Sequence, residues 1–185
     1  MTVMDRRRLL VAAAASAVAA ACGSTAASPS PTRSTTPTTT AAAAATASKA
    51  TVELAKGGSF AFTLRPDKAP QTVARFAQKA RSGSYQGLTF HRVENWVVQG
   101  GDPTGSGSGG NQVASEYNDL PFLAGAVGIA RASNPAQMND SQFFIVKIDS
   151  HHLDGMYANF GLLTAGMDVV QGIKIGDKIK AITIE

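Results

Sequence analysis

Residues 90–101 read FHRVENWVVQGG, which is two strand-like runs joined by a short polar connection. The runs at 89–93 and 96–99 are rich in β-branched and aromatic residues, a composition typical of strands. Arg92 is a charged residue inside the first run, and Gln99 is a polar residue inside the second. His91 stands beside Arg92 and suggests acid–base chemistry. However, successive side chains of a strand point to opposite faces, so we expect His91 to face away from Arg92 and to be structural.

Similar runs occupy the chain from residue 50 to residue 185. They lie at 51–54, 59–64, 126–130, 143–148, 159–163 and 179–184. One helix is expected from Pro70, where the missing N–H costs nothing, to a stop near Gly83, and a second at 167–171. Many short strands with few helices predict a mainly β fold, a closed antiparallel barrel with helices over its ends.

The first 21 residues differ from the rest and are typical of a signal peptide. A basic start with Arg6, Arg7 and Arg8 precedes a mostly apolar run at 9–21, which is shorter than the roughly 20 residues of a membrane span. The basic residues followed by Leu9 and Leu10 resemble a twin-arginine export signal. An ordinary secretory signal that is rich in arginine is the alternative.

Cys22 is the only cysteine of the chain and follows three alanines. This arrangement resembles a bacterial lipoprotein cleavage site, so we expect Cys22 to be lipidated. The alternative is a plain cleavage site with an uninvolved cysteine. Residues 22–49 are mostly Ser, Thr, Pro and Ala, lack apolar periodicity and predict a disordered tether of roughly 25–31 Å r.m.s. span. We therefore expect an extracytoplasmic protein anchored to the outer face of the cytoplasmic membrane.

Charge and motif content argue against several classes of function. The net charge of +4 comes from the first 49 residues, because residues 50–185 hold 12 basic and 12 acidic side chains, so we expect no nucleic-acid partner. The three histidines, His91, His151 and His152, belong to no HExxH or other metal motif, so we predict no metal and no cofactor. A metal-dependent hydrolase is a third alternative, which would require inhibition by a chelator.

Five motifs occur together and in a fixed order from residue 69 onward. They are APQTV at 69–73, GLTFHRV at 87–93, QGGDP at 99–103, SQFFI at 141–145, and LDG at 153–155 followed by FG at 160–161. In these motifs residues 51–185 resemble the cyclophilin-type peptidyl-prolyl cis-trans isomerases. The resemblance implies an eight-stranded antiparallel β-barrel capped by two helices. It also implies proline-containing polypeptides as substrates and no cofactor. We expect a monomer.

The resemblance also implies roles for single positions. Arg92 matches the catalytic arginine of the family, a donor to the prolyl nitrogen, and Gln99 matches the glutamine that positions it. The positions that form the family's proline pocket are matched by Trp96, Val97, Phe144, Leu153 and Tyr157. The positions that contact the substrate chain are matched by Gln142, Ala132 and Ser133. His152 stands where the family often has Trp.

One departure from the family lies between the two runs of the opening stretch. Glu94-Asn95 replaces a common Pro-Gly turn and is one residue shorter, which can shift Trp96 and Val97. We predict that residues 50–185 form an isomerase domain acting on exported polypeptides. The alternative is a Pro-peptide-binding or chaperone module with little or no turnover.

Overall fold

The structure is a computed structural model that describes residues 47–185. The predicted signal peptide at 1–21 and most of the predicted tether at 22–49, Cys22 included, lie outside the described residues. The fold begins slightly before the predicted boundary at residue 50, because Ala47 is buried and the first strand starts at Lys49. The Ser48 amide donates to the Glu185 carbonyl oxygen over 2.7 Å, so the two ends of the described chain are joined.

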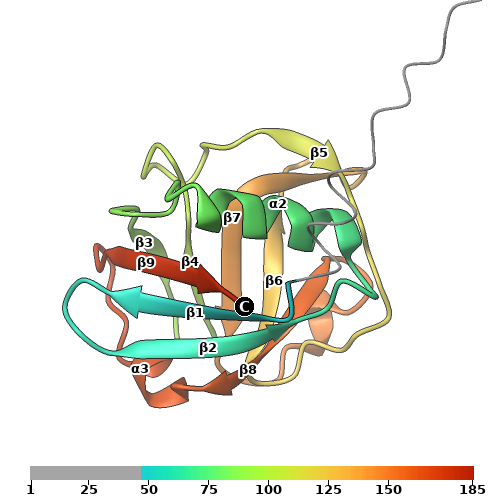
Figure 1. The fold of residues 1–185 in the computed structure, drawn as a ribbon. Coiled ribbons are helices and arrows are strands. Elements are labelled where there is room, and N and C mark those ends of the chain that lie inside the picture. Colours follow the sequence, from blue (N-terminus) through green and yellow to red (C-terminus); the bar gives the residue numbers. More distant parts are fainter. Residues whose placement is uncertain (1–46) are drawn as a thin grey trace, which may run out of the picture. The chain divides into compact units, whose positions relative to one another are not determined.

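Nine strands of residues 47–185 form one antiparallel sheet (Figure 1). They are β1 (Lys49–Leu54), β2 (Ser59–Leu64), β3 (Phe90–Val93), β4 (Val97–Gly100), β5 (Gln112–Ala114), β6 (Ala126–Arg131), β7 (Gln137–Val146), β8 (Asn159–Ala165) and β9 (Ile179–Ile184). Their order is β3-β4-β7-β6-β8-β2-β1-β9, and β5 pairs with β7 off this path. The prediction of a mainly β antiparallel fold with two helices is confirmed.

The prediction of a closed eight-stranded barrel is wrong, because the curled sheet is a half-barrel with β3 and β9 at its ends. Within residues 47–185 these ends meet at the isolated bridge Thr89–Lys178 and through neighbouring backbone bonds such as the Phe90 amide to the Asp177 carbonyl, 2.9 Å. β3 has four residues, and its register on β4 shifts at a bulge between Phe90 and Arg92. Bulges bend a strand and interrupt its ladder, so β3 does not continue alongside β9.

The two helices are α2 (Pro70–Arg81) and α3 (Met167–Gln171). α2 crosses the sheet beside β7 and β9, and α3 lies beside β2 (Figure 1). α2 begins at Pro70, and the Glu116 carboxylate accepts the amides of Gln71 (2.9 Å) and Thr72 (2.6 Å), which caps free N–H groups of its first turn. Both predicted helices are confirmed, and a 3₁₀ turn at His151–Leu153 is additional.

Strand alternation divides the buried side chains into two clusters. On β7, Phe143 and Ile145 join the main core, whereas Phe144 and Val146 join a smaller cluster on the opposite face. Val97, Phe122, Ala126 and Leu153 complete the smaller cluster, with Trp96 and Tyr157 packed against it. β7 is therefore buried on both faces, and its second face supports the site described below.

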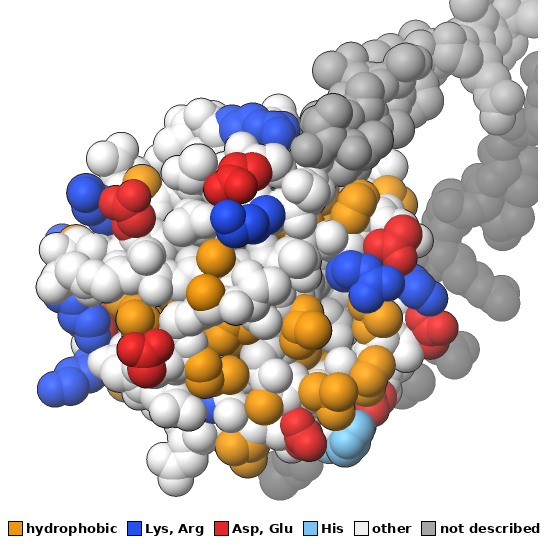
Figure 2. Space-filling model, turned by 60° about the horizontal axis from the view of Figure 1, so that its bottom comes forward, with side chains coloured by type: hydrophobic (Ala, Val, Ile, Leu, Met, Phe, Trp, Pro, Cys, Tyr) orange, Lys and Arg blue, Asp and Glu red, His pale blue; other side chains and the backbone are white. Residues whose placement is uncertain are grey.

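The surface carries charges of both signs. On the face drawn in Figure 2, acidic and basic side chains lie next to one another, between patches of apolar side chains. Exposed ion pairs include Arg65–Asp67 (2.8 Å) and Lys56–Asp177 (2.5 Å). No helix within residues 47–185 has the length and apolar character needed to cross a membrane.

Candidate active site

A row of directly opposed residues runs across four neighbouring strands. Arg92 of β3 pairs with Gln99 of β4, Gln99 pairs with Phe144 of β7, and Phe144 pairs with Gly128 of β6. Opposed residues of paired strands project from the same face of a sheet. The strand register therefore brings Arg92, Gln99 and Phe144 together, although the sequence separates the first from the last by about 50 positions.

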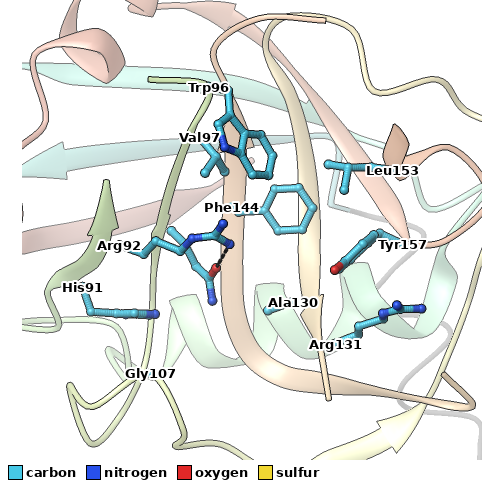
Figure 3. A pocket seen from close by; sticks show the side chains of 11 residues that line it. His91, Arg92, Trp96, Val97, Gly107, Ala130, Arg131, Phe144, Leu153 and Tyr157 are labelled. Atoms are coloured by element: carbon cyan, nitrogen blue, oxygen red, sulfur yellow. Dashed lines mark hydrogen bonds between the residues drawn. The ribbon is translucent and has the colours of Figure 1, made fainter. Parts of the chain in front are cut away.

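This face of the sheet carries a pocket of about 330 Å³ (Figure 3). Its lining residues are His91, Arg92, Trp96, Val97, Gln99, Gly107, Ala130, Arg131, Phe144, Leu153 and Tyr157. Arg92 projects into the pocket on one side, Leu153 and Tyr157 lie opposite, and Phe144 lies between them. The pocket thus contains seven of the residues predicted from the sequence: Arg92, Gln99, Trp96, Val97, Phe144, Leu153 and Tyr157.

The apolar part of the pocket is held by aromatic contacts. The Phe144 ring stacks on Phe122 with centroids 5.6 Å apart, and the Tyr157 ring meets it edge-on at 5.5 Å. Phe144 is 4% exposed and Leu153 is 6% exposed, so their positions depend on packing and not on a ligand. Such aromatic pairs are rigid and add about 0.5–1.5 kcal/mol beyond the area that they bury. The pocket offers a preformed apolar surface for a small ring.

A chain of amide hydrogen bonds sets the orientation of Gln99. The Gln142 amide nitrogen donates to the carbonyl oxygens of Gly107 (3.1 Å) and Gly109 (2.7 Å), which leaves its side-chain oxygen to accept the Gln99 amide over 3.0 Å. The Gln99 side-chain oxygen therefore faces Arg92, whose Nη1 lies 3.5 Å away. Gln142 is 2% exposed and lies behind Gln99, so it supports the pocket without lining it.

Glu94 contacts both Arg92 and Trp96. Arg92 Nε donates to Glu94 Oε1 over 2.6 Å, and Trp96 Nε1 donates to Glu94 Oε2 over 2.8 Å. The hydrogen bond from Arg92, followed by that from Trp96, lowers the pKa of Glu94. The guanidinium carbon of Arg92 also lies 5.3 Å from the Trp96 ring centroid, within cation–π range. Glu94 of the short turn thus links two residues of the pocket lining, Arg92 and Trp96.

His91 does not point away from Arg92 as strand alternation predicts, because both residues line the pocket. The reason is the bulge: Phe90 pairs with Gly100 and Arg92 with Gln99, so His91 is an extra residue without a partner in the ladder. Within residues 47–185 neither of its buried ring nitrogens has a hydrogen-bond partner. Burial lowers the pKa of His91, Asp102 opposes this effect, and the positive charge of Arg92 adds to it.

The remaining predicted residues lie around the pocket and not among its lining. Ala132 and Ser133 follow β6, and Ser133 is exposed. His152 is exposed, and the centroid of its ring lies 5.1 Å from that of the Trp96 ring. Arg131 was not predicted, yet it lines the pocket with its guanidinium carbon 5.0 Å from the Tyr157 ring centroid. Arg131 ends an unremarkable strand run, and no motif distinguishes it.

The loop that supplies Gly107 is organised by Asp102, which is 1% exposed. Its carboxylate accepts the Thr104 amide over 2.8 Å, the Thr104 hydroxyl over 2.9 Å and the Gly107 amide. Burial would raise the pKa of Asp102, but these hydrogen bonds outweigh burial and hold the pKa below its usual value. An ionised Asp102 therefore keeps Gly107 in place beside His91 and Gln142.

The arrangement offers one exposed cationic donor beside an apolar pocket. Arg92 has five N–H groups, of which two contact Glu94 and Gln99, so others remain for a ligand. Within residues 47–185 no three His, Cys, Asp or Glu side chains are close enough to hold a metal ion. The geometry suits the binding of a small apolar ring next to a neutral or partly negative atom.

Known proteins resemble this chain in sequence and in fold. Residues 49–184 match the family model described as cyclophilin type peptidyl-prolyl cis-trans isomerase/CLD. Peptidyl-prolyl cis-trans isomerase B of Bacillus subtilis is 39% identical over 137 residues, which cover 71% of this chain and 94% of that one. A peptidyl-prolyl cis-trans isomerase of Synechococcus elongatus is 37% identical over 142 residues, covering 74% and 96%.

Among solved structures, a cyclophilin type peptidyl-prolyl cis-trans isomerase of Cryptosporidium parvum superposes with a TM-score of 0.68 at 26% identity, covering 75% of this chain and 98% of that one. A second structure of that protein, determined in the presence of the dipeptide Ala-Pro, has a TM-score of 0.67 at 28% identity and covers 74% and 98%.

Proposed function

Because the chain belongs to the cyclophilin-type peptidyl-prolyl cis-trans isomerases, we propose that it accelerates rotation about X–Pro bonds through a hydrogen bond from Arg92 to the prolyl nitrogen. The observation that carries this proposal is the Arg92 guanidinium, held by Glu94 and facing Gln99, at the edge of an apolar pocket. The pocket residues Phe144, Leu153 and Tyr157 would bind the proline ring.

Rotation about a peptide bond is slow because the amide nitrogen shares its lone pair with the carbonyl group. The barrier is about 18–20 kcal/mol, and uncatalysed exchange of an X–Pro bond takes tens to hundreds of seconds. No covalent bond is made or broken, so neither a nucleophile nor a proton relay is required. The catalyst must favour the twisted state, in which the nitrogen regains its lone pair.

Arg92 supplies a donor suited to that state. The twisted prolyl nitrogen accepts a hydrogen bond that the planar amide nitrogen cannot accept, so the bond stabilises the transition state selectively. A guanidinium is a rigid, planar cation, and the apolar pocket strengthens its field by excluding water. Gln99, oriented by Gln142, helps to direct the guanidinium.

The test compares the full chain with its Arg92→Ala variant, using rotation of an Ala–Pro test peptide followed by NMR exchange. We expect kcat/KM to fall about 100-fold or more, since removing one preorganised donor typically costs a factor of 10²–10³. Arg81→Ala, which removes an exposed arginine at the end of α2, serves as the control and should keep full activity. Equal activity of the Arg92→Ala variant and the unaltered chain would contradict the role of Arg92.

A Pro-peptide-binding or chaperone module without turnover is the second candidate. It is favoured by the Glu94 carboxylate, which partly neutralises the guanidinium that catalysis needs. In that case the unaltered chain would bind the Ala–Pro peptide, detected by chemical-shift changes, without accelerating its rotation. Isomerisation by the unaltered chain therefore separates the two functions.

We further propose that the isomerase acts outside the cytoplasm, as a monomer tethered through a lipid on Cys22. The support is the signal-like composition of residues 1–21, the single cysteine at the end of that segment and the Ser/Thr/Pro/Ala-rich segment that follows. Mass spectrometry of the mature chain should find an acylated Cys22. The Cys22→Ser variant should move from the membrane to the soluble fraction, and unchanged membrane association would contradict the anchor.

The oligomeric state is tested separately. Light scattering of the purified chain in detergent should give the mass of one chain per particle.

A further inference from the structure

We propose that Glu94 is a positioning residue of this active site, which holds the Arg92 guanidinium and the Trp96 indole in a fixed relation to each other. The inference rests on the proposed role of Arg92 and adds to it the device that orients the guanidinium. Glu94 belongs to the short turn that distinguishes the opening stretch of the sequence, where a residue of this charge has no role implied by the motifs around it.

The two carboxylate oxygens of Glu94 serve different partners. Oε1 accepts Arg92 Nε at 2.6 Å, and Oε2 accepts Trp96 Nε1 at 2.8 Å. The carboxylate is thus a bridge between a cation and an indole, and it is not a simple surface ion pair. Each partner also contacts the other, since the Arg92 guanidinium lies 5.3 Å from the Trp96 ring.

The hairpin places these three side chains together for a reason that lies in the backbone. Arg92 lies on β3, whereas Glu94, Asn95 and Trp96 form the connection that turns the chain back into β4, so the reversal carries Trp96 back toward Arg92. The Glu94 amide donates to the Val97 carbonyl over 2.8 Å, which closes the connection between β3 and β4. Because this closure uses the backbone of Glu94, its side chain can be replaced without removing the bond that shapes the turn.

The bridge determines which N–H groups of Arg92 face the pocket. Nε is occupied by Glu94, so the two terminal nitrogens are directed away from the turn, toward Gln99 and the pocket. A free arginine side chain samples many rotamers, and catalysis would then have to order it in every turnover. The same carboxylate restrains the Trp96 indole, which lines the pocket between Arg92 and His152.

The experiment uses the full chain and three variants, Glu94→Ala, Glu94→Gln and Asn95→Ala. Asn95 is the exposed neighbour in the same turn and serves as the matched control. Two quantities are measured: kcat/KM for the Ala–Pro peptide, and the fluorescence anisotropy of Trp96. Trp96 is the only tryptophan of the chain, so the anisotropy reports on this side chain alone.

We expect Glu94→Ala to lower kcat/KM about 10-fold, mainly through kcat, and to lower the anisotropy because the indole loses its acceptor. Glu94→Gln keeps the size of the side chain and one acceptor oxygen, so its kcat/KM should fall only about threefold. Asn95→Ala should match the unaltered chain in both measurements. Circular dichroism and urea unfolding check that each variant is folded.

Unchanged kcat/KM and anisotropy in both Glu94 variants would overturn the proposal, and so would faster isomerisation, which would mean that Glu94 holds Arg92 back. The Arg92→Ala variant separates this failure from that of the proposed function. If Arg92→Ala is inactive while both Glu94 variants are fully active, only the inference about Glu94 fails. If Arg92→Ala is fully active, the proposed function fails, and the anisotropy still shows whether Glu94 restrains Trp96.

Discussion

A single methyl group added at Gly128 should displace the Phe144 ring, which lines the pocket. Gly128 lies opposite Phe144 in the pairing of β6 with β7, on the face that carries the pocket. A Cβ at this position would lie 2.3 Å from Cζ of Phe144 and 2.8 Å from Cε1 of Phe122. Both atoms belong to buried rings, so neither can turn aside as the end of a flexible side chain would.

The size of the effect follows from these distances. Carbon atoms in contact lie about 3.5–4.0 Å apart, so the Phe144 ring has to move by roughly 1.2 Å or more. Phe122 and Tyr157 hold the ring on two sides, and the space open to it is the pocket. A misplacement of about 1 Å can cost about 10²-fold in rate, and overpacking a core costs about 1–3 kcal/mol. We expect Gly128→Ala to lower kcat/KM about 100-fold and the free energy of unfolding by about 1–3 kcal/mol.

The assay combines peptide isomerisation with urea unfolding of the full chain. Gly172→Ala is the control, because a Cβ there would make contacts of 3.4 Å and 3.5 Å with helix carbonyl oxygens and Gly172 does not line the pocket. Phe144→Leu in the Gly128→Ala background should recover stability beyond the sum of the two single effects, since it removes the clashing ring. Full activity and unchanged stability of Gly128→Ala would refute the argument that the Phe144 ring has nowhere else to go.

Three further perturbations test other contacts. Gln142→Leu leaves the Gly107 carbonyl and the Gln99 amide without a partner, and urea unfolding should show a loss of about 1–3 kcal/mol together with reduced kcat/KM. The folded-state pKa of Asp102 lies below its ordinary value, so the ionised Asp102 carboxylate stabilises the folded protein above about pH 4. This contribution to the free energy of unfolding is lost as the pH falls through the folded-state pKa. Unfolding below pH 4 should therefore be less pH-dependent in Asp102→Asn. The Arg131 guanidinium contacts tyrosine rings, and its charge is therefore available to an acidic side chain of a substrate. Peptides with Glu beside proline should react up to about fivefold faster at low salt than peptides with Lys there. The Arg131→Ala variant should lose this preference.

Much of the secondary structure could be read from local patterns. The helix at 167–171 and the strands at 59–64 and 179–184 have the predicted bounds, because apolar periodicity and Gly or Pro punctuation are local signals. β5 was missed, since three residues are too few to show a period. The first half of β7 was also missed, because residues 137–142 are mostly polar and reveal their burial only through pairing with β5 and β6.

The sequence by itself determined the family, the mainly β antiparallel fold, and the placement of Arg92 and Gln99 inside two neighbouring strand runs. These features depend on residue type and on spacing along the chain, which folding does not change. Only the tertiary structure decided that the sheet stays a half-barrel, that a bulge turns His91 toward the pocket, and that Gln142 is buried behind Gln99. Each of these depends on the register between strands distant in sequence, and register is chosen by how side chains of both faces pack together. The empty space at Gly128 into which the Phe144 ring fits has the same origin.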